Sequence, residues 1–342
     1  MQSPQGRGPL ADAGSGVADK IPRQREENTM KPIAMLERMM LIRAFEEKNV
    51  ALQAEGKAAG TCTSVGQEAS AVGVVFALEP KDLILTNHRS AGHLLARGAD
   101  AGRMMAEIGG RATGYCKGKS GTLHISVKDL GVILTSTIVG GELSLATGVG
   151  LSLSMQGGDA VAACFFGDGA ACEGIFHESV NLAAVWNLPV LYVCENNQWQ
   201  AYVRRKETML IDHISERAAG YGIEGRTVDG NDVEAVHAAA SEAIAAIRKT
   251  RRPFLLETYT YRLRGHFEPD DQSYVDAAEL AGWKARDPIA TLRKRLLERG
   301  EATEASLDAI AGGVREKIES AAQFAASSPF PAPEEVLTDV YA

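Results

Sequence analysis

Four short apolar runs along the chain have the length and composition of buried strands. They cover Leu83–Thr86, Val161–Phe166, Val190–Cys194 and Phe254–Tyr261. Longer segments, in which apolar residues recur every three or four positions as in an amphipathic helix, lie between them. Continuous apolar strands that alternate with helices are typical of a parallel sheet covered on both faces. The pattern therefore predicts an α/β fold with a doubly wound, mainly parallel sheet.

Helices are predicted before, between and after these strands. The first begins near Thr29 and ends before Gly56. The other predicted helical stretches are 67–78, 143–155, 174–186, 232–248 and two segments within 287–326. No linker interrupts this alternation, so we expect residues 30–342 to form one domain.

The first 29 residues differ from the rest of the chain. They are polar, rich in Gly, Pro and Ser, and without apolar periodicity, which predicts a disordered N-terminal extension. No apolar stretch of signal-peptide length follows the first charges, and several acidic residues count against an organelle transit peptide. These features predict a cytoplasmic protein.

Composition and charge narrow the classes of function. The 342 residues include 36 Lys and Arg against 44 Asp and Glu, a formal net charge of −8, so we expect no nucleic-acid partner. No apolar run approaches the roughly 20 residues that span a bilayer, so we expect no membrane partner. The five cysteines form no C-x-x-C pair, and Cys164 and Cys194 lie in predicted strands. This usage predicts reduced, packed thiols.

Polar residues follow two of the predicted strands. The second strand runs into GDGAA (167–171), and the third runs into ENN (195–197). Because one predicted helix separates these strands, we expect them to be neighbours whose ends converge. A glycine turn before a helix N-terminus suits a phosphate, and the oxygens of Asp168 and Asn197 suit Mg²⁺. The residues alone predict a metal-bridged diphosphate site.

The stretch from Gly167 to Asn197 resembles the thiamine-diphosphate motif, which opens with GDG and closes with NN. The chain is similar to the α subunit of the decarboxylating component of 2-oxoacid dehydrogenase complexes, the group that includes pyruvate, branched-chain 2-oxoacid and acetoin dehydrogenases. The similarity covers nearly all of residues 30–342. Other segments that carry it are VGQEA (65–69), TNHRSAGHLLARG (86–98), GKSGTLH (118–124), IVGGELSLATGVG (138–150), TYRLRGHFEPD (260–270) and RDPI (286–289).

The resemblance implies roles for individual residues around thiamine diphosphate and Mg²⁺. Asp168 and Asn197 are implied to bind the metal through side-chain oxygens, with the backbone carbonyl of Trp199 as a third ligand. Backbone groups of Val139 and Gly140 are implied to lie against the aminopyrimidine ring of the cofactor.

Further residues are implied to contact the diphosphate. They are the backbone N–H groups of Gly169 and Ala170, the guanidinium of Arg89, and the imidazole of His88, where many relatives have a tyrosine. His266 matches a histidine of the family's active-site loop, which contacts the diphosphate and orders the loop. We therefore predict His266 as a catalytic residue and expect its polar loop, which has little to pack it, to be mobile without cofactor.

Several positions depart from the family pattern. Three usual histidines and the serine that kinases phosphorylate in mitochondrial relatives are replaced by Cys62, Ala91, Arg264 and Phe267. These changes leave the cofactor residues intact but leave the substrate open. Gly148 and Gly150, in the predicted helix 143–155, are interpreted as positions of close helix packing.

The resemblance also implies an assembly and a reaction. Thiamine diphosphate supplies an electron sink, and a separate β subunit supplies the glutamate that contacts its pyrimidine nitrogen. The implied enzyme is a heterotetramer of two α and two β chains that decarboxylates a 2-oxoacid, or cleaves acetoin, and passes the acyl group to a lipoyl acyltransferase.

Three alternatives are weighed against this interpretation. The chain could belong to a stand-alone thiamine-diphosphate carboligase or acyl transferase without a lipoyl partner. It could also be a non-catalytic nucleotide- or metal-binding subunit, which the intact motif residues disfavour. The segment GYCKGKS (114–120) suggests a P-loop kinase, but three residues instead of four separate its glycines and no strand precedes it.

Overall fold

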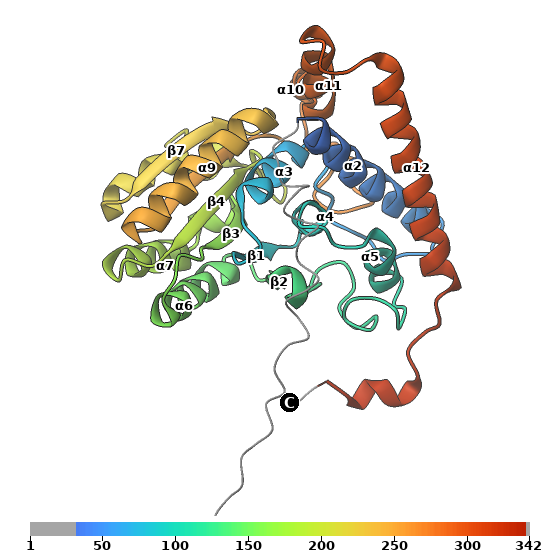
Figure 1. Ribbon diagram of the computed structural model, residues 1–342, viewed down its shortest axis with the longest axis horizontal. Coiled ribbons are helices and arrows are strands. Elements are labelled where there is room, and N and C mark those ends of the chain that lie inside the picture. The colour runs from blue at the N-terminus through green and yellow to red at the C-terminus, as the bar shows by residue number, and fades with distance from the viewer. Residues whose placement is uncertain (1–31, 340–342) are drawn as a thin grey trace, which may run out of the picture. The chain divides into compact units, whose positions relative to one another are not determined.

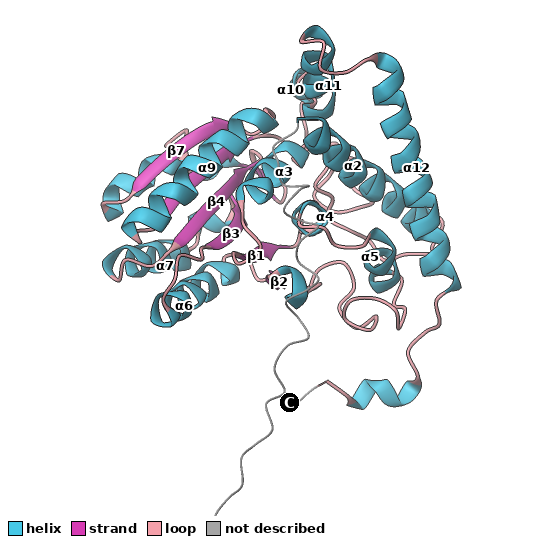
Figure 2. Ribbon diagram, viewed as in Figure 1, coloured by secondary structure: helices cyan, strands magenta, loops and turns pink. Residues whose placement is uncertain are grey.

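The computed structural model describes residues 32–339, which form one compact unit. The extension predicted over residues 1–29 lies outside the described residues. The described chain forms a parallel sheet with helices on both of its faces (Figures 1 and 2). The predicted fold class is confirmed.

The main sheet has six parallel strands in the order β2-β1-β3-β4-β8-β7. The strands are β1 (Leu83–Asn87), β2 (Val132–Ser136), β3 (Ala162–Gly167), β4 (Val190–Asn196), β7 (Glu224–Asp229) and β8 (Phe254–Tyr259). A separate two-stranded antiparallel hairpin pairs β5 (Trp199–Gln200) with β6 (Val203–Arg204). The four predicted strands are β1, β3, β4 and β8, and β3 and β4 are neighbours as expected.

Helices precede, connect and follow the strands. They are α2 (Pro32–Ala54), α3 (Glu68–Ala77), α4 (Ala91–Ala96), α5 (Ala101–Ile108), α6 (Gly141–Gln156), α7 (Gly174–Val185), α8 (Arg205–Thr208), α9 (Val233–Thr250), α10 (Ala277–Lys284), α11 (Pro288–Glu298) and α12 (Glu304–Ser327). Asp232 and Asp287 cap the N-termini of α9 and α11 by accepting backbone N–H groups of the first turn.

Alternate residues of the central strands enter two different hydrophobic cores. Ala163 and Phe165 on β3 pack into the core that includes α2, α3 and α9. Cys164 and Phe166 on the same strand pack into the core that includes α6 and α7. Because successive side chains of a strand point to opposite faces, both faces of the sheet are buried, which explains the uninterrupted apolar runs.

The two glycines of α6 behave differently. A Cβ atom on Gly150 would lie 2.6 Å from Cγ2 of Val190, so this glycine allows α6 to approach β4 closely. A Cβ atom on Gly148 would meet nothing within 4 Å among the described residues. The predicted packing role is confirmed for Gly150 and is wrong for Gly148 within this chain.

All five cysteines are free thiols, and Cys164 and Cys194 are buried in the sheet as predicted. Among residues 32–339 we find no helix whose length and hydropathy would let it cross a membrane.

Candidate active site

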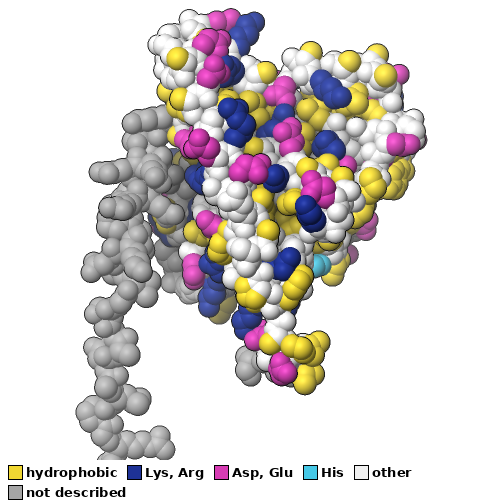
Figure 3. Space-filling view, turned by 90° about the vertical axis from the view of Figure 1, so that its right-hand side faces the viewer, with side chains coloured by type: hydrophobic (Ala, Val, Ile, Leu, Met, Phe, Trp, Pro, Cys, Tyr) yellow, Lys and Arg dark blue, Asp and Glu magenta, His cyan; other side chains and the backbone are white. Residues whose placement is uncertain are grey.

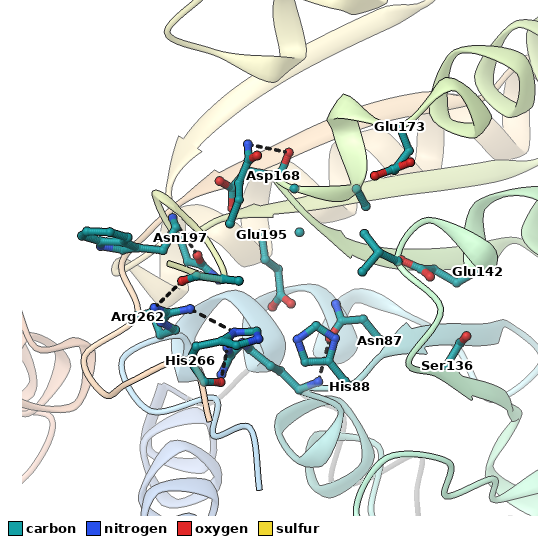
Figure 4. Close-up of a pocket in the computed structure, with 18 of the residues that line it drawn as sticks. Asn87, His88, Ser136, Glu142, Asp168, Glu173, Glu195, Asn197, Arg262 and His266 are labelled. Carbon is teal, nitrogen blue, oxygen red and sulfur yellow. Dashed lines mark hydrogen bonds between the residues drawn. The ribbon is translucent and has the colours of Figure 1, made fainter. Parts of the chain in front are cut away.

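A cavity of about 280 Å³ opens at the carboxyl ends of four adjacent strands. Its lining includes Asn87 from β1, Ser136 from β2, Gly167 from β3 and Asn197, which follows β4. Polar side chains from these separate segments converge on one space (Figure 4). This is the edge at which open parallel sheets place their ligands.

The cavity collects nearly all the residues predicted from the sequence. The ones that line it are His88, Arg89, Val139, Asp168, Gly169, Ala170, Asn197, Trp199 and His266. Gly140 is not among the lining residues; it adopts a left-handed φ of 76° as the N-cap of α6. The roles predicted for these residues remain predictions, but the chain brings them to one place.

Asp168 is buried with its carboxylate unpartnered. The residue is 1% exposed, and no described residue donates a hydrogen bond to either carboxylate oxygen. Burial raises the pKa of Asp168 to about 6, against the opposing effects of the nearby backbone N–H groups of Asp168 and Asn197 and of the positive charges of Arg205 and Arg262. Two buried oxygens without donors fit a hard cation.

Asn197 presents a fixed amide beside this carboxylate. Its Nδ2 donates to Oε1 of Gln67 at 3.1 Å, and its Oδ1 accepts from the backbone N–H of Trp199, also at 3.1 Å. These contacts set the direction of the amide oxygen. The described residues contain no cluster of three or more His, Cys, Asp or Glu side chains that could hold a metal, so a cation here would need oxygens from a ligand or water as well.

Two buried arginines carry charge without a carboxylate partner. Arg89 donates to the backbone oxygens of Thr63 and His266 at 2.7 and 2.8 Å, and Arg262 donates to the backbone oxygen of Ala201 and the hydroxyl of Tyr274. Neither guanidinium forms an ion pair with any side chain in the part of the chain that the structure describes. Because an unneutralised buried charge is costly, this arrangement favours an anionic ligand.

Both histidines of the cavity are neutral at physiological pH. Burial, reinforced by the positive charge of Arg89, lowers the pKa of His88 to about 3 and that of His266 to about 4. Nδ1 of His266 lies 3.3 Å from Nη2 of Arg89 and 3.4 Å from Nη1 of Arg262. Since a guanidinium can only donate, Nδ1 accepts and Nε2 carries the proton, which it can donate to a ligand.

The glycines of the GDG turn supply space. Gly169 has an ordinary helical φ of −63°, and Gly167 is not among the residues with positive φ. A Cβ atom on Gly167 would meet nothing within 4 Å, and Gly167 lines the cavity. The absent side chain therefore leaves room for a ligand. A short 3-10 turn (Ala170–Cys172) leads from here to α7.

The loop that carries His266 is packed more tightly than the sequence suggested. Oδ2 of Asp270 accepts from the backbone N–H of His266 and the hydroxyl of Tyr274, at 2.6 and 2.7 Å. The backbone N–H of Glu268 donates to the backbone oxygen of Thr61. The expectation that this polar segment has little to pack it is wrong, because its own acidic residues bind its backbone.

The positions that depart from the family pattern lie outside the cavity lining. Cys62 is buried, and burial raises the pKa of its thiol. Ala91 is the first residue of α4, and Arg264 pairs with Glu268. A Cβ atom on Gly60 would collide with the ring of Phe267, so that ring packs against the backbone there.

Sequence reasoning missed several lining residues, notably Gln67, Glu142, Glu195 and Arg262. Glu195 directly precedes Asn196 at the end of β4, a signal that could have identified it. Its Oε1 accepts from Oγ of Ser70 at 3.0 Å and lies 3.1 Å from Nε2 of His93. Glu142 directly precedes the predicted helix 143–155 and follows Gly140 by two residues, a signal that could have identified it.

The segment that suggested a P-loop binds a carboxylate of its own chain. Glu107, which is fully buried, accepts backbone N–H groups from Cys116, Gly118 and Ser120 at 2.7, 2.9 and 2.7 Å. The amides that would hold a phosphate are therefore already occupied by an anion. This supports the rejection of a P-loop kinase made on spacing.

Comparison with known proteins agrees with this geometry. A family model described as "Dehydrogenase E1 component" matches residues 37–334. The α subunit of acetoin:2,6-dichlorophenolindophenol oxidoreductase from Bacillus subtilis is 44% identical over 313 residues, 91% of this chain and 93% of that protein. The pyruvate dehydrogenase E1 component subunit alpha from Rhizobium meliloti is 41% identical over 304 residues, 88% of this chain and 87% of that protein.

Proposed function

Because this chain belongs to the family of dehydrogenase E1 components, we propose that it is the α subunit of a thiamine-diphosphate-dependent 2-oxoacid or acetoin dehydrogenase. The observation that carries the proposal is the pairing, within one cavity, of an unpartnered buried carboxylate with two unneutralised buried arginines. A metal-bound diphosphate complements both, since the cation satisfies Asp168 and the anion neutralises the arginines.

Side-chain oxygens of Asp168 and Asn197, with the backbone carbonyl of Trp199, would hold Mg²⁺. Mg²⁺ keeps ligands from phosphate and water, so a site with one carboxylate and one amide suits it when a diphosphate completes the shell.

The diphosphate would lie against the positive side of the cavity. Arg89, His88 and His266 would donate to it from side chains, and Gly169 and Ala170 from backbone N–H groups. His266 suits this role because its Nδ1 already faces two guanidinium groups and its Nε2–H remains to donate. Val139 and Gly140 would support the ring end of the cofactor. When bound, thiamine diphosphate supplies the electron sink needed to cleave a carbon–carbon bond next to a carbonyl.

A β subunit is the expected partner, and we infer a heterotetramer of two α and two β chains that transfers the acyl group to a lipoyl acyltransferase. Several exposed apolar residues on and just before α6 and α7, which we call the α6–α7 face, support such a partner. This face consists of the exposed residues Ile138, Val139, Leu145, Met155, Leu182, Val185 and Trp186. The face crossed by α12 differs, since acidic and basic side chains are interspersed over it (Figure 3). Large exposed apolar surfaces mark sites of association.

The free thiols of the chain support a reducing compartment, and we infer a cytoplasmic location. The substrate is a 2-oxoacid or acetoin, as the names of the relatives vary between pyruvate and acetoin enzymes.

The proposal is tested with the chain co-expressed with its β partner. Turnover of pyruvate, branched-chain 2-oxoacids and acetoin should depend on thiamine diphosphate and Mg²⁺ and require both subunits. Asp168→Ala should abolish Mg²⁺-dependent binding of thiamine diphosphate in calorimetry, because it removes the carboxylate ligand to the metal. Unchanged affinity would show that the site assignment is wrong, and full turnover by the isolated chain would show that the site does not need a β subunit.

A further inference from the structure

Glu142 is, like Asp168, a buried acid of the cavity with an unpartnered carboxyl oxygen, and the proposed function gives it no role. It lies in the first turn of α6 and is 1% exposed. No described residue donates a hydrogen bond to its Oε2, yet the residue lines the cavity. A buried carboxyl oxygen without a donor is uncommon in a folded chain, and its presence in a cavity points to a ligand that supplies one.

No described cation compensates Glu142. It forms no ion pair within residues 32–339, and the titratable group that touches it is the thiol of Cys164 on β3, whose Sγ lies 3.5 Å from the backbone oxygen of Glu142. The other acids that line the cavity are Asp168, Glu173 and Glu195. Burial raises the pKa of Glu142 to about 7, so this carboxyl is poised between its two forms at neutral pH.

Glu142 also lies apart from the charged end of the cavity. Figure 4 shows Asp168, Asn197, Arg262 and His266 grouped on one side, with Glu142 on the opposite side near Ser136. Ile138 and Val139, which precede Glu142 in the sequence and also line the cavity, are apolar. The cavity therefore has a charged end that suits an anionic head group. Glu142 is the buried acid of the opposite side, where Figure 4 also places the exposed Glu173.

We propose that Glu142 accepts a hydrogen bond from the amino group on the ring of bound thiamine diphosphate, and so fixes the ring end of the cofactor as the arginines fix its diphosphate. This inference rests on the proposed function. An N–H donor satisfies Oε2 and favours the carboxylate form, so binding should release a proton from Glu142 near pH 7.

The test uses the assembled αβ protein and two substitutions. Glu142→Leu removes the acceptor, and Glu142→Gln keeps an acceptor of the same shape that does not titrate. Glu178→Gln, an exposed acid on α7, serves as the control. Calorimetry with Mg²⁺ measures affinity for thiamine diphosphate and for inorganic pyrophosphate, which lacks the ring, in buffers of different ionisation enthalpy.

Glu142→Leu should weaken binding of thiamine diphosphate about 10- to 100-fold, the loss typical of a hydrogen bond to a charged group, and leave pyrophosphate binding unchanged. Glu142→Gln should bind thiamine diphosphate within a few-fold of wild type but lose the proton release that wild type and Glu178→Gln show at pH 7. If Glu142→Leu does not fold, the comparison of proton release between Glu142→Gln and wild type tests the inference on its own.

The inference is overturned if Glu142→Gln releases the same number of protons as wild type, or if Glu142→Leu binds thiamine diphosphate normally or weakens both ligands equally. These outcomes are independent of the Asp168→Ala experiment. A normal affinity in Asp168→Ala would refute the proposed function itself.

Discussion

The carboxylate of Asp168 should destabilise the metal-free protein even though the holoenzyme needs it. In the folded chain burial raises its pKa from 3.8 to about 6, so the folded state binds a proton more tightly than the unfolded state. The protonated carboxyl therefore contributes stability at low pH, and this contribution is lost as the pH rises from about 4 through 6. A shift of about two pKa units corresponds to about 3 kcal/mol.

Asp168→Asn removes this charge while preserving the shape of the side chain. At pH 7.5, with a chelator present, the variant should be more stable than wild type by up to about 3 kcal/mol. For a chain of 342 residues this corresponds to a rise of about 4 °C in Tm. At pH 4 the difference should vanish, because the wild-type carboxyl is then protonated in the folded state.

Asp82 provides a matched control, because it is equally buried but fully partnered. Its oxygens accept backbone N–H groups of Glu79 and Val161, at 2.7 and 2.9 Å, and two guanidinium nitrogens of Arg248. Asp82→Asn breaks this buried pair and should destabilise the protein by about 3 kcal/mol. The same chemical change is thus expected to have opposite signs at the two positions.

Thermal unfolding followed by circular dichroism, with and without Mg²⁺ and thiamine diphosphate, measures all three proteins. Cofactor should raise the Tm of wild type and leave that of Asp168→Asn unchanged. If Asp168→Asn lowers the metal-free Tm as much as Asp82→Asn does, Asp168 has donors that we have not recognised and the reasoning fails.

Three further experiments test the packing described above. Gly150→Ala should destabilise the protein by about 1–3 kcal/mol, because the added methyl group collides with β4. Gly148→Ala should stabilise the metal-free chain by up to about 1 kcal/mol. Equal shifts of the Tm in the two variants would refute this contrast. Asp270→Asn should accelerate hydrogen exchange across residues 264–274. Asp271→Asn should not, because this exposed residue accepts one backbone N–H through Oδ1, which an amide oxygen can also do. Matched exchange profiles would argue against Asp270 as the organiser of the loop. Glu107→Gln should speed tryptic cleavage in the loop 114–120, because an amide cannot accept all the backbone N–H groups; an unchanged cleavage rate would count against that carboxylate holding the loop.

The sequence predicted the centre of the sheet better than its edges. Strands β1, β3, β4 and β8 are buried on both faces and therefore appear as apolar runs. The edge strand β7 is largely exposed and reads EGRTVD, which has no apolar run to detect. The other edge strand is β2. The apolar and polar pattern of its residues continues into the loop before α6, so the sequence did not mark where this strand ends.

The sequence predicted those site residues that directly follow a strand. It did not predict properties that depend on burial, such as whether a charged side chain has a partner. Asp168 and Asn197 stand next to recognisable strands, so their convergence follows from strand order. The sequence could not show that Arg89 and Arg262 lack carboxylate partners, or that Oε2 of Glu142 lacks a donor. Those properties depend on residues from distant segments and emerge only when the chain is folded.

The carboxylate of Asp168 and the guanidinium groups of Arg89 and Arg262 line the same cavity but form no ion pair, and this separation affects how ligands bind. Mg²⁺ entering alone would satisfy Asp168 but add positive charge near two buried arginines, and a diphosphate entering alone would meet the acidic side chains unshielded. Each ligand should therefore raise the affinity for the other, and by reciprocity the two increases must be equal. The cavity thus favours simultaneous occupancy, and the states with neither ligand or with both should dominate over any state with one.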